Sequence, residues 1–585
     1  MTTPQVLRTA PVIKVNGSPL SDLALMQLDD LRISRVLRLP SRAALRFSDI
    51  GYAIAAGQVF AIGSMVEVGD PDGTVIFLGE VTGVEMNLES GQPEFTVLAD
   101  DLAYKLTLGT KVRTFTQVSY SDVIGQIAGE HGLQHTVTGL TTPRHDYLLQ
   151  ADSDFGFLNE IADRTGCDWW VDDRALIVQP YGTASTPVAL DAGADLHSFS
   201  VRASALHPGT ATIKGWWPKT KQSVSASGAR ATNGADANLV QPYLQATNLA
   251  GANTTVSTAD MPGDQQEAEK LADRLMQRWT AGAVTAKGSC NAKPTITPGG
   301  SVSIEAAGPA SGTYQVSEVE HTYNRRGFQT RFTAGDRRPS GLVDMLSGAQ
   351  PSSFRREGLV IGIVTTVGNS QGSAGDIKVK YTSLGGEVES NWARVVTLGA
   401  GAQRGLTFLP EVNDEVIVGF EGGDARRPVI LGGVYNGRDV PVEFGVANGT
   451  VSQRRITSRL GHFVELADGT DPANQHIQLN LAGGNHQVRL GKDKLDAIVP
   501  AGVPITVKSG DAAIEIGTDG SITLSGQKIT LKSKTDVEIS GVNITAKASV
   551  KAAISGTMVE AKASATGEVS AGGSLTLKGA MVAVN

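Results

Sequence analysis

The last part of the chain alternates apolar and polar residues with a period of two, from position 521 to beyond position 560. Such alternation is typical of β-strands that bury one face. Glycines at 526, 541, 556, 567, 572 and 573 interrupt the pattern and indicate turns. The segment therefore predicts a long run of short, two-faced strands. The apolar positions that we assign to the buried face are Ile522, Leu524, Ile529, Leu531, Val537, Ile539, Val542, Ile544, Val550 and Ile554.

One copy of this segment has no means of covering its apolar face. An open sheet would expose that face and two strand edges, and the small side chains leave only a narrow core. Three copies wound about a common axis would close the sheet and bury the face, at roughly 1.5–3 kcal/mol for each Val, Ile or Leu. We therefore expect residues 465–585 to form a trimeric intertwined β-helix or β-prism. The alternatives are a single-chain β-helix, an adhesin stalk and a disordered tail, and the strict alternation argues against the last.

Residues 1–335 predict a β-rich module with a few helices. Alternating segments at 11–17, 43–49 and 73–87 are separated by Gly, Asp and Asn turns, which is the pattern of antiparallel strands. Further strands are expected between 300 and 335. The fold class is therefore mainly β, with barrel-like domains in this module.

Three segments of the module have helical periodicity instead. The first, 119–133, begins with a capping-box pattern and ends near a glycine, and the second, 152–166, also ends on a glycine. The third covers 265–282. The residues that define these helices are Ser119, Asp122 and Gly132 in the first, Phe157, Leu158, Ile161, Ala162 and Gly166 in the second, and Ala268, Leu271, Ala272, Leu275 and Trp279 in the third.

A second β-rich domain follows a predicted linker at 336–357, which carries Pro, Ser and paired Arg. Residues 358–440 hold five short alternating segments, a number that fits a small barrel of the OB type. Residues 441–464 are expected to connect this barrel to the terminal segment. The five segments are 359–367, 375–384, 391–399, 414–423 and 428–437.

Composition and charge narrow the classes of function. The net charge of −8 argues against nucleic acid as the main partner. Two cysteines, Cys167 and Cys290, are too few for a disulfide framework and favour a reducing compartment of synthesis. The N-terminus has no apolar signal region, and no apolar run of about 18 residues is present. We therefore expect assembly in the cytoplasm without a signal peptide, and no membrane span.

Three stretches of the predicted barrel carry a resemblance to a known family. The residues "NWARVV" at 391–396, "GLTFLPEVNDEVIVGFEGGD" at 405–424 and "RRPVILGGVYNG" at 426–437 resemble the OB domain of VgrG proteins and of related phage tail spikes. The family motif has Gly where this chain has Asn413, and Asn tolerates the left-handed conformation of a tight turn. Residues 1–335 resemble the tail-hub module of the same family. The opening residues are similar to spikes of extracellular, phage-tail-like contractile injection systems.

The resemblance implies a homotrimeric hub and spike of a contractile injection machine. Its implied partners are inner-tube and baseplate proteins, a PAAR-type tip protein, effector cargo and the envelope of the target cell, with no nucleic acid. The machine would be a phage-tail-like particle that is released or acts outside the cell. Docking of the tip protein is expected at the last apolar residues, Leu577, Val582 and Val584.

An enzymatic role is not expected, and neither a cofactor nor a metal ion is implied. The chain has no GxSxG, HExxH, P-loop or CxxC motif. Too few residues separate the barrel from the terminal segment to hold the lysozyme domain of the phage relatives. The alternatives are a tail-associated cell-wall-degrading enzyme and a receptor-binding fibre. The barrel carboxylates, which we expect on a solvated rim, are Glu411, Asp414, Glu415, Glu421 and Asp424.

An OB barrel can also bind oligonucleotides through exposed aromatic residues. The aromatic residues of this barrel lie within alternating strands, and we therefore expect them in the core. These residues are Tyr381, Trp392, Phe408, Phe420 and Tyr435.

Overall fold

The computed structural model divides the chain into two compact units, residues 1–440 and 441–585. The predicted linker 336–357 lies outside the described residues, and so do the side chains of Leu275 and Trp279. The structure describes residues 10–335 apart from 90, 142–143, 184, 204–209, 219–220, 229–254, 257–261, 263–264 and 282–283, residues 358–442 apart from 369–373 and 385–387, and residues 445–584.

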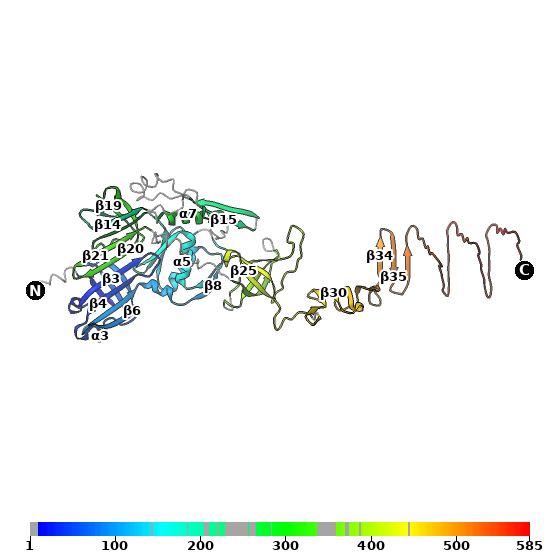
Figure 1. The fold of residues 1–585 in the computed structure, drawn as a ribbon, viewed down its shortest axis with the longest axis horizontal. Coiled ribbons are helices and arrows are strands. Elements are labelled where there is room, and N and C mark those ends of the chain that lie inside the picture. The colour runs from blue at the N-terminus through cyan, green and yellow to red at the C-terminus, as the bar shows by residue number, and fades with distance from the viewer. Residues whose placement is uncertain are drawn as a thin grey trace. The chain divides into compact units, whose positions relative to one another are not determined.

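A 13-stranded sheet forms the largest part of the first unit. Early and late strands meet where β3 (Leu28–Val36) pairs antiparallel with β20 (Gly312–Asn324), so that blue and green strands lie side by side in Figure 1. The other strands are β1 (Val12–Val15), β2 (Ser18–Pro19), β4 (Arg42–Ser48), β5 (Met65–Gly69), β6 (Val75–Glu89), β7 (Gln92–Asp100), β13 (Val188–Asp191), β14 (Leu196–Ala203), β18 (Val284–Asn291), β19 (Ser301–Glu305) and β21 (Gly327–Ala334).

Alternating residues of these strands fill two separate apolar cores, in keeping with the predicted mainly β module. The first core gathers residues such as Leu31, Leu45 and Phe47, and the second gathers residues such as Val302 and Phe332. Short helices missed by the sequence pattern, α2 (Asp22–Met26) and α3 (Ala53–Ala56), cover part of the first core.

A third core belongs to α4 (Tyr120–Glu130) and α5 (Asp154–Thr165), which confirm the first two predicted helices. Ser119 and Asp122 form the expected capping box, and Gly166 ends α5 in the left-handed conformation. The strands around them are β8 (Lys111–Phe115), β9 (Gln134–Val137), β10 (Leu148–Asp152), β11 (Cys167–Asp172) and β12 (Ala175–Pro180), together with the 3-10 helix η2 (Leu102–Thr107).

The third predicted helix is α7 (Gln265–Ala281), which packs on β15 (Thr210–Trp217) and β16 (Gln222–Gly228). Ala268, Leu271 and Ala272 are buried there, as the periodicity predicts. A short strand, β17 (Thr255–Val256), pairs with β15.

The predicted OB barrel is confirmed as a closed barrel of five strands. Asn413 has φ 78°, which places it in the left-handed turn that the family motif gives to glycine. We expected all five aromatic residues of the barrel in its core. This expectation was wrong for Phe408 and Tyr435, which are 54% and 72% exposed. The strands are β22 (Val360–Val367), β23 (Asp376–Tyr381), β24 (Ala393–Val395), β25 (Glu415–Phe420) and β26 (Pro428–Gly433).

The second unit contains two antiparallel sheets and a hairpin, and its first strands lie within the predicted connector 441–464. Residues 526–584, which we call the extended stretch, run as an open zigzag, contain no strand and pair with no strand of the same chain (Figure 1). The strands are β27 (Val446–Ala447) and β28 (Thr450–Val451) in the hairpin, β29 (Gln453–Thr457), β30 (Phe463–Asp468), β31 (Gln475–Asn480), β32 (Gln487–Gly491) and β33 (Leu495–Ile498) in the five-stranded sheet, and β34 (Ile505–Ser509), β35 (Ala512–Ile516) and β36 (Ile522–Ser525) in the three-stranded sheet.

Candidate functional site

The five-stranded sheet β29–β33, which we name the neck sheet, carries a continuous apolar face that its own chain leaves uncovered. Val464 lies opposite Ile456 on one side and Leu479 on the other, and Leu479 lies opposite Val488. Leu466, Ile477, Leu490 and Leu495 form a second row in the same manner. Cross-strand neighbours of this kind normally stabilise a sheet by packing under a second layer. All eight side chains are exposed.

The opposite face of the neck sheet is polar and is the better covered of the two. The Glu465 residue is only 8% exposed, and its carboxylate lies 3.1 Å from His476 Nε2 and 3.8 Å from Arg455 Nη1. The Arg455 guanidinium stacks over the ring of Phe463, and Arg489 approaches His476 Nδ1 at 3.3 Å. The sheet therefore covers its polar face and exposes its apolar face, the reverse of a sheet on a soluble monomer.

The three-stranded sheet β34–β36 repeats this arrangement. Ile516 pairs with Ile505 and Ile522, while Ile514 pairs with Val507 and Leu524. Five of these six side chains are classed as exposed, and Ile505 is half-buried. Each of the two sheets in the second unit thus leaves an apolar face uncovered.

The predicted shaft residues are also left uncovered by the single chain. Ile522 and Leu524 lie on β36, and the other eight lie in the extended stretch 526–584. Their exposed fractions range from 47% for Leu524 to 102% for Val542. The three residues expected to dock a tip protein, Leu577, Val582 and Val584, are exposed as well. An assembly core at these positions stays a prediction, because one chain contains no partner for them.

A second candidate site is the joint between the helical core and the OB barrel in the first unit. Strand β10 and the residue before it alternate between the two modules: Tyr147 and Leu149 pack in the apolar core of the barrel, while Leu148 packs with α4 and α5. The Tyr147 hydroxyl donates a hydrogen bond to the Glu389 carbonyl oxygen at 2.9 Å. Because two cores share one short strand, the modules are held as one body at this point.

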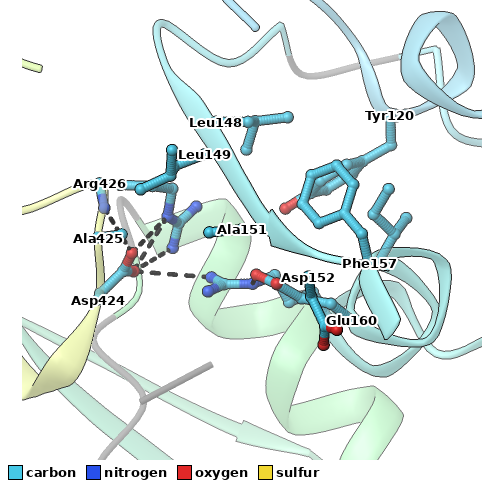
Figure 2. A pocket seen from close by; sticks show the side chains of 12 residues that line it. Tyr120, Leu148, Leu149, Ala151, Asp152, Phe157, Glu160, Asp424, Ala425 and Arg426 are labelled. Atoms are coloured by element: carbon cyan, nitrogen blue, oxygen red, sulfur yellow. Dashed lines mark hydrogen bonds and ion pairs between the residues drawn. The ribbon is translucent and has the colours of Figure 1, made fainter. Parts of the chain in front are cut away.

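A buried charge cluster completes the joint (Figure 2). The Arg426 guanidinium of the barrel donates to both carboxylate oxygens of Asp424, and its Nη1 donates to Glu267 of α7 at 3.0 Å. Asp424 also lies 3.6 Å from Arg164 of α5. Burial alone would raise the pKa of Asp424, but Arg426 and Arg164 hold it well below its usual range.

The neighbouring Arg427 links the same barrel loop to β15 and to the segment that precedes α7. It donates to the carbonyl oxygens of Pro262 at 2.6 Å and Trp216 at 3.1 Å. The expectation that Asp424 lies on a solvated rim was therefore wrong. The signal in the sequence was the pair Arg426 and Arg427, which follows Asp424 after one alanine. Such arginines can compensate the charge of a buried carboxylate, but burial itself requires a second module to cover them.

The described residues contain no group of three or more His, Cys, Asp and Glu side chains that could hold a metal ion. Within the same residues, no helix is long and apolar enough to cross a membrane. Both cysteines are buried, and burial raises the pKa of the Cys290 thiol to about 11. Neither cysteine therefore has the environment of a reactive thiol.

Comparison with known proteins gives two family matches. The "Type VI secretion system/phage-baseplate injector OB domain" matches residues 360–435, which are the closed barrel. The "Alg8 N-terminal domain" matches residues 8–325, which include the helical core and every strand of the 13-stranded sheet except β21.

Curated relatives include spike proteins of type VI secretion. The chain is 28% identical over 194 residues to the spike protein VgrG1a of Pseudomonas aeruginosa, covering 25% of this chain and 30% of that protein. It is 42% identical over 76 residues to VgrG1c of the same organism, covering 13% of this chain and 10% of that protein. The matched region is thus less than a third of either relative.

Solved structures with a similar chain trace include tail and secretion proteins. A type VI secretion component of E. coli, described as similar to T4 bacteriophage tail proteins, is 15% identical with a TM-score of 0.44, covering 72% of this chain and 99% of that chain. A chain of the Francisella PdpA-VgrG complex is 9% identical with a TM-score of 0.45, covering 88% of each chain.

The injector OB domain and the VgrG relatives define a VgrG-like spike protein of the contractile injection class. More than half of the sequence matches one family model, and the chain belongs to the Alg8 N-terminal domain family.

Proposed function

We propose that this protein is the central hub and spike of a contractile injection machine and that it works as a homotrimer. The proposal rests on the neck sheet, whose apolar face is exposed while its polar face is covered. Exposed apolar patches larger than a few hundred Å² mark interaction sites on soluble proteins. Uncovered apolar side chains recur on β34–β36 and in the extended stretch, so a partner that covers them all must be as long as the second unit itself. Two further copies of the same chain meet that requirement.

Covering this face supplies the free energy for assembly. Each neck-sheet side chain is already partly buried in the single chain, so covering the remainder is worth on the order of 1 kcal/mol. The shaft residues gain more, because most of their surface is exposed. Summed over three copies, the gain amounts to tens of kcal/mol before the cost of ordering is subtracted. Closed threefold symmetry also removes the free strand edges.

The mechanism that we propose is mechanical rather than catalytic. Residues 1–335 form the hub, the barrel at 358–440 forms a collar, and residues 465–585 form the needle. Contraction of the machine drives the hub forward, and the joint at Asp424 and Arg426 transmits the force to the barrel. A stiff, edge-free shaft then concentrates the force on a small area of the target envelope.

The partners follow from this role. We propose that the hub binds inner-tube and baseplate proteins, and that Leu577, Val582 and Val584 form the surface for a PAAR-type tip protein. Effector cargo would travel with the spike. The particle would be assembled in the cytoplasm and would act outside the cell that made it.

Electron microscopy of the purified chain tests the proposal. The expected image is a threefold particle with a straight rod, and a globular particle with a flexible tail would contradict it. Two activity assays address the alternatives. Clearing of a peptidoglycan gel by the pure protein would favour a cell-wall-degrading enzyme, and binding to target cells without the rest of the particle would favour a receptor-binding fibre.

A further inference from the structure

A small cavity lies inside the joint between the helical core and the barrel, and part of its wall is polar. Its volume is about 70 Å³, enough for more than one water molecule. The Tyr120 hydroxyl is buried beside it and has no hydrogen-bond partner in the structure. Figure 2 shows this hydroxyl directed among the lining residues, with Glu160 and Asp152 on the same wall.

Among the ion pairs of the described residues, Asp424 and Glu267 each contact Arg426 of the barrel within 4 Å, and Glu160 contacts no barrel cation. Its only such partner is Arg164, one helical turn further along α5, at 3.3 Å. Arg164 also approaches Asp424 of the barrel at 3.6 Å, so two carboxylates compete for one guanidinium. The Glu160 side chain is only 21% exposed.

Charged and titratable groups face Glu160 from every element around the cavity. Asp424 and Arg426 come from the barrel loop, Arg164 from α5 and Tyr120 from α4. Asp152 lines the cavity from β10, and Glu267 of α7 is bound to Arg426. When Glu160 is ionised, it adds a negative charge beside Asp424 and competes with it for Arg164. When it carries a proton, it does neither.

We propose that Glu160 is a proton-operated latch, closed when its carboxyl group is protonated and released when that proton is lost to water in the cavity. With the proton in place, Glu160 no longer competes for Arg164, which is left to Asp424, and the barrel loop is held against α5 and α7. Without it, an ionised Glu160 repels Asp424 and draws Arg164 away from the barrel. The inference concerns the first unit only and does not depend on the trimer.

The electrostatics agree with this geometry. Burial raises the pKa of Glu160 to about 7, and the nearby Asp424 acts in the same direction while Arg164 opposes it. The folded state therefore binds more protons than the unfolded state between the ordinary glutamate pKa and about 7. Across that window the joint must weaken as the pH rises, and it must be tightest on the acidic side of neutrality.

Hydrogen exchange measured by mass spectrometry on the full chain tests the latch. Exchange is compared between about pH 6 and pH 8 after correction for intrinsic rates, in peptides that cover α5 and residues 420–430. We expect protection in both peptides to fall by about tenfold between the two pH values. Glu160→Gln, a neutral isostere, should hold the joint protected at both. Glu269→Gln, which neutralises an exposed carboxylate on α7, should behave as the wild type does.

Protection that is the same at both pH values in the wild type would overturn the latch. So would a Glu160→Gln protein that retains the wild-type pH response. If that variant does not fold, infrared difference spectroscopy of the wild-type chain decides the question. A protonated carboxyl band that disappears between pH 6 and 8 supports the latch, and absence of any such band rejects it.

Discussion

Val464 on β30 and Leu479 on β31 lie directly opposite each other, and their side chains are 36% and 49% exposed. A cross-strand apolar pair in the middle of a sheet is normally covered by a second layer. On the other face of the same strand, Glu465 is nearly buried. The pair therefore marks the surface through which we propose that copies of the chain associate.

A charge placed in this surface should separate the copies. Ile477 lies between Leu466 and Leu490 in the neck sheet, so Ile477→Asp would bury three carboxylates in the proposed interface. We expect the protein to run as a monomer or a weak, concentration-dependent trimer in size-exclusion chromatography with light scattering. Gln478→Asp, on the polar face, is the matched control and should remain trimeric. Equal behaviour of the two variants would refute the assignment of faces.

Shortening a single apolar side chain further along the shaft should lower the stability of the shaft without dissociating the trimer. Ile544→Ala removes one predicted core side chain per copy, and we expect a loss on the order of 2–4 kcal/mol per copy in shaft stability. The measurement is the temperature at which the shaft melts in calorimetry. Lys547→Ala changes a polar position of the same alternating segment, which we expect on the outer face, and should leave that temperature unchanged. A larger decrease in the melting temperature for the lysine variant would show that the buried and exposed faces of the shaft are the opposite of those predicted.

The joint in the first unit should depend on Arg426. Arg426→Ala leaves Asp424 and Glu267 buried without their shared cation, and breaking a buried pair in this way costs about 3–5 kcal/mol. We expect the barrel to unfold in a separate step at lower urea than the hub. Arg438→Ala, at an exposed position of the same domain, should unfold as the wild type does. Loss of cooperativity in both variants would mean that the cluster is not what couples the modules.

The hub should lose stability in acid because of one buried histidine. His321 of β20 is fully buried and lies 3.0 Å from Thr330 Oγ1, and burial lowers its pKa to about 3, with Arg35 adding to the effect. The unfolded chain therefore binds one more proton than the folded chain between about pH 6.5 and 3. Stability should fall by a few kcal/mol across that window.

His321→Asn should flatten this part of the pH profile in urea unfolding experiments, because the side chain can still bond Thr330 but does not titrate. His197→Asn, at an exposed position of β14, should keep the wild-type slope. A wild-type slope in the His321 variant would show that other groups cause the acid sensitivity.

Local signals in the sequence predicted much of the fold. The capping box of Ser119 and Asp122, the glycine after α5 and the five strands of the barrel depend on residues close together in the chain, and each is confirmed. The residue pattern of the barrel also resembles the OB domain of spike proteins, and the match to the injector OB domain confirms that resemblance. The alternation after position 521 predicted a long run of strands, and the single chain forms only β36 (Ile522–Ser525) there, with no strand in residues 526–584.

Features that depend on distant parts of the chain were not predictable from local patterns. Asp424 was expected in solvent because Arg164, which it approaches, and Glu267, which shares Arg426 with it, lie more than 150 residues away. The sequence analysis did not predict the apolar surface of the neck sheet. Its polar strand positions hold residues such as Arg455 and His476, which are typical of the solvent-exposed face of a sheet. Only the register of β29–β33 reveals that this polar face is the covered one.

The mass of the full-length chain in solution, measured by sedimentation velocity at low micromolar concentration, tests the central claim most directly. We expect a single species at three times the chain mass of 61.1 kDa, with the high frictional ratio of an elongated particle. A stable species at 61.1 kDa would mean that one chain tolerates its uncovered apolar face, and it would contradict the spike.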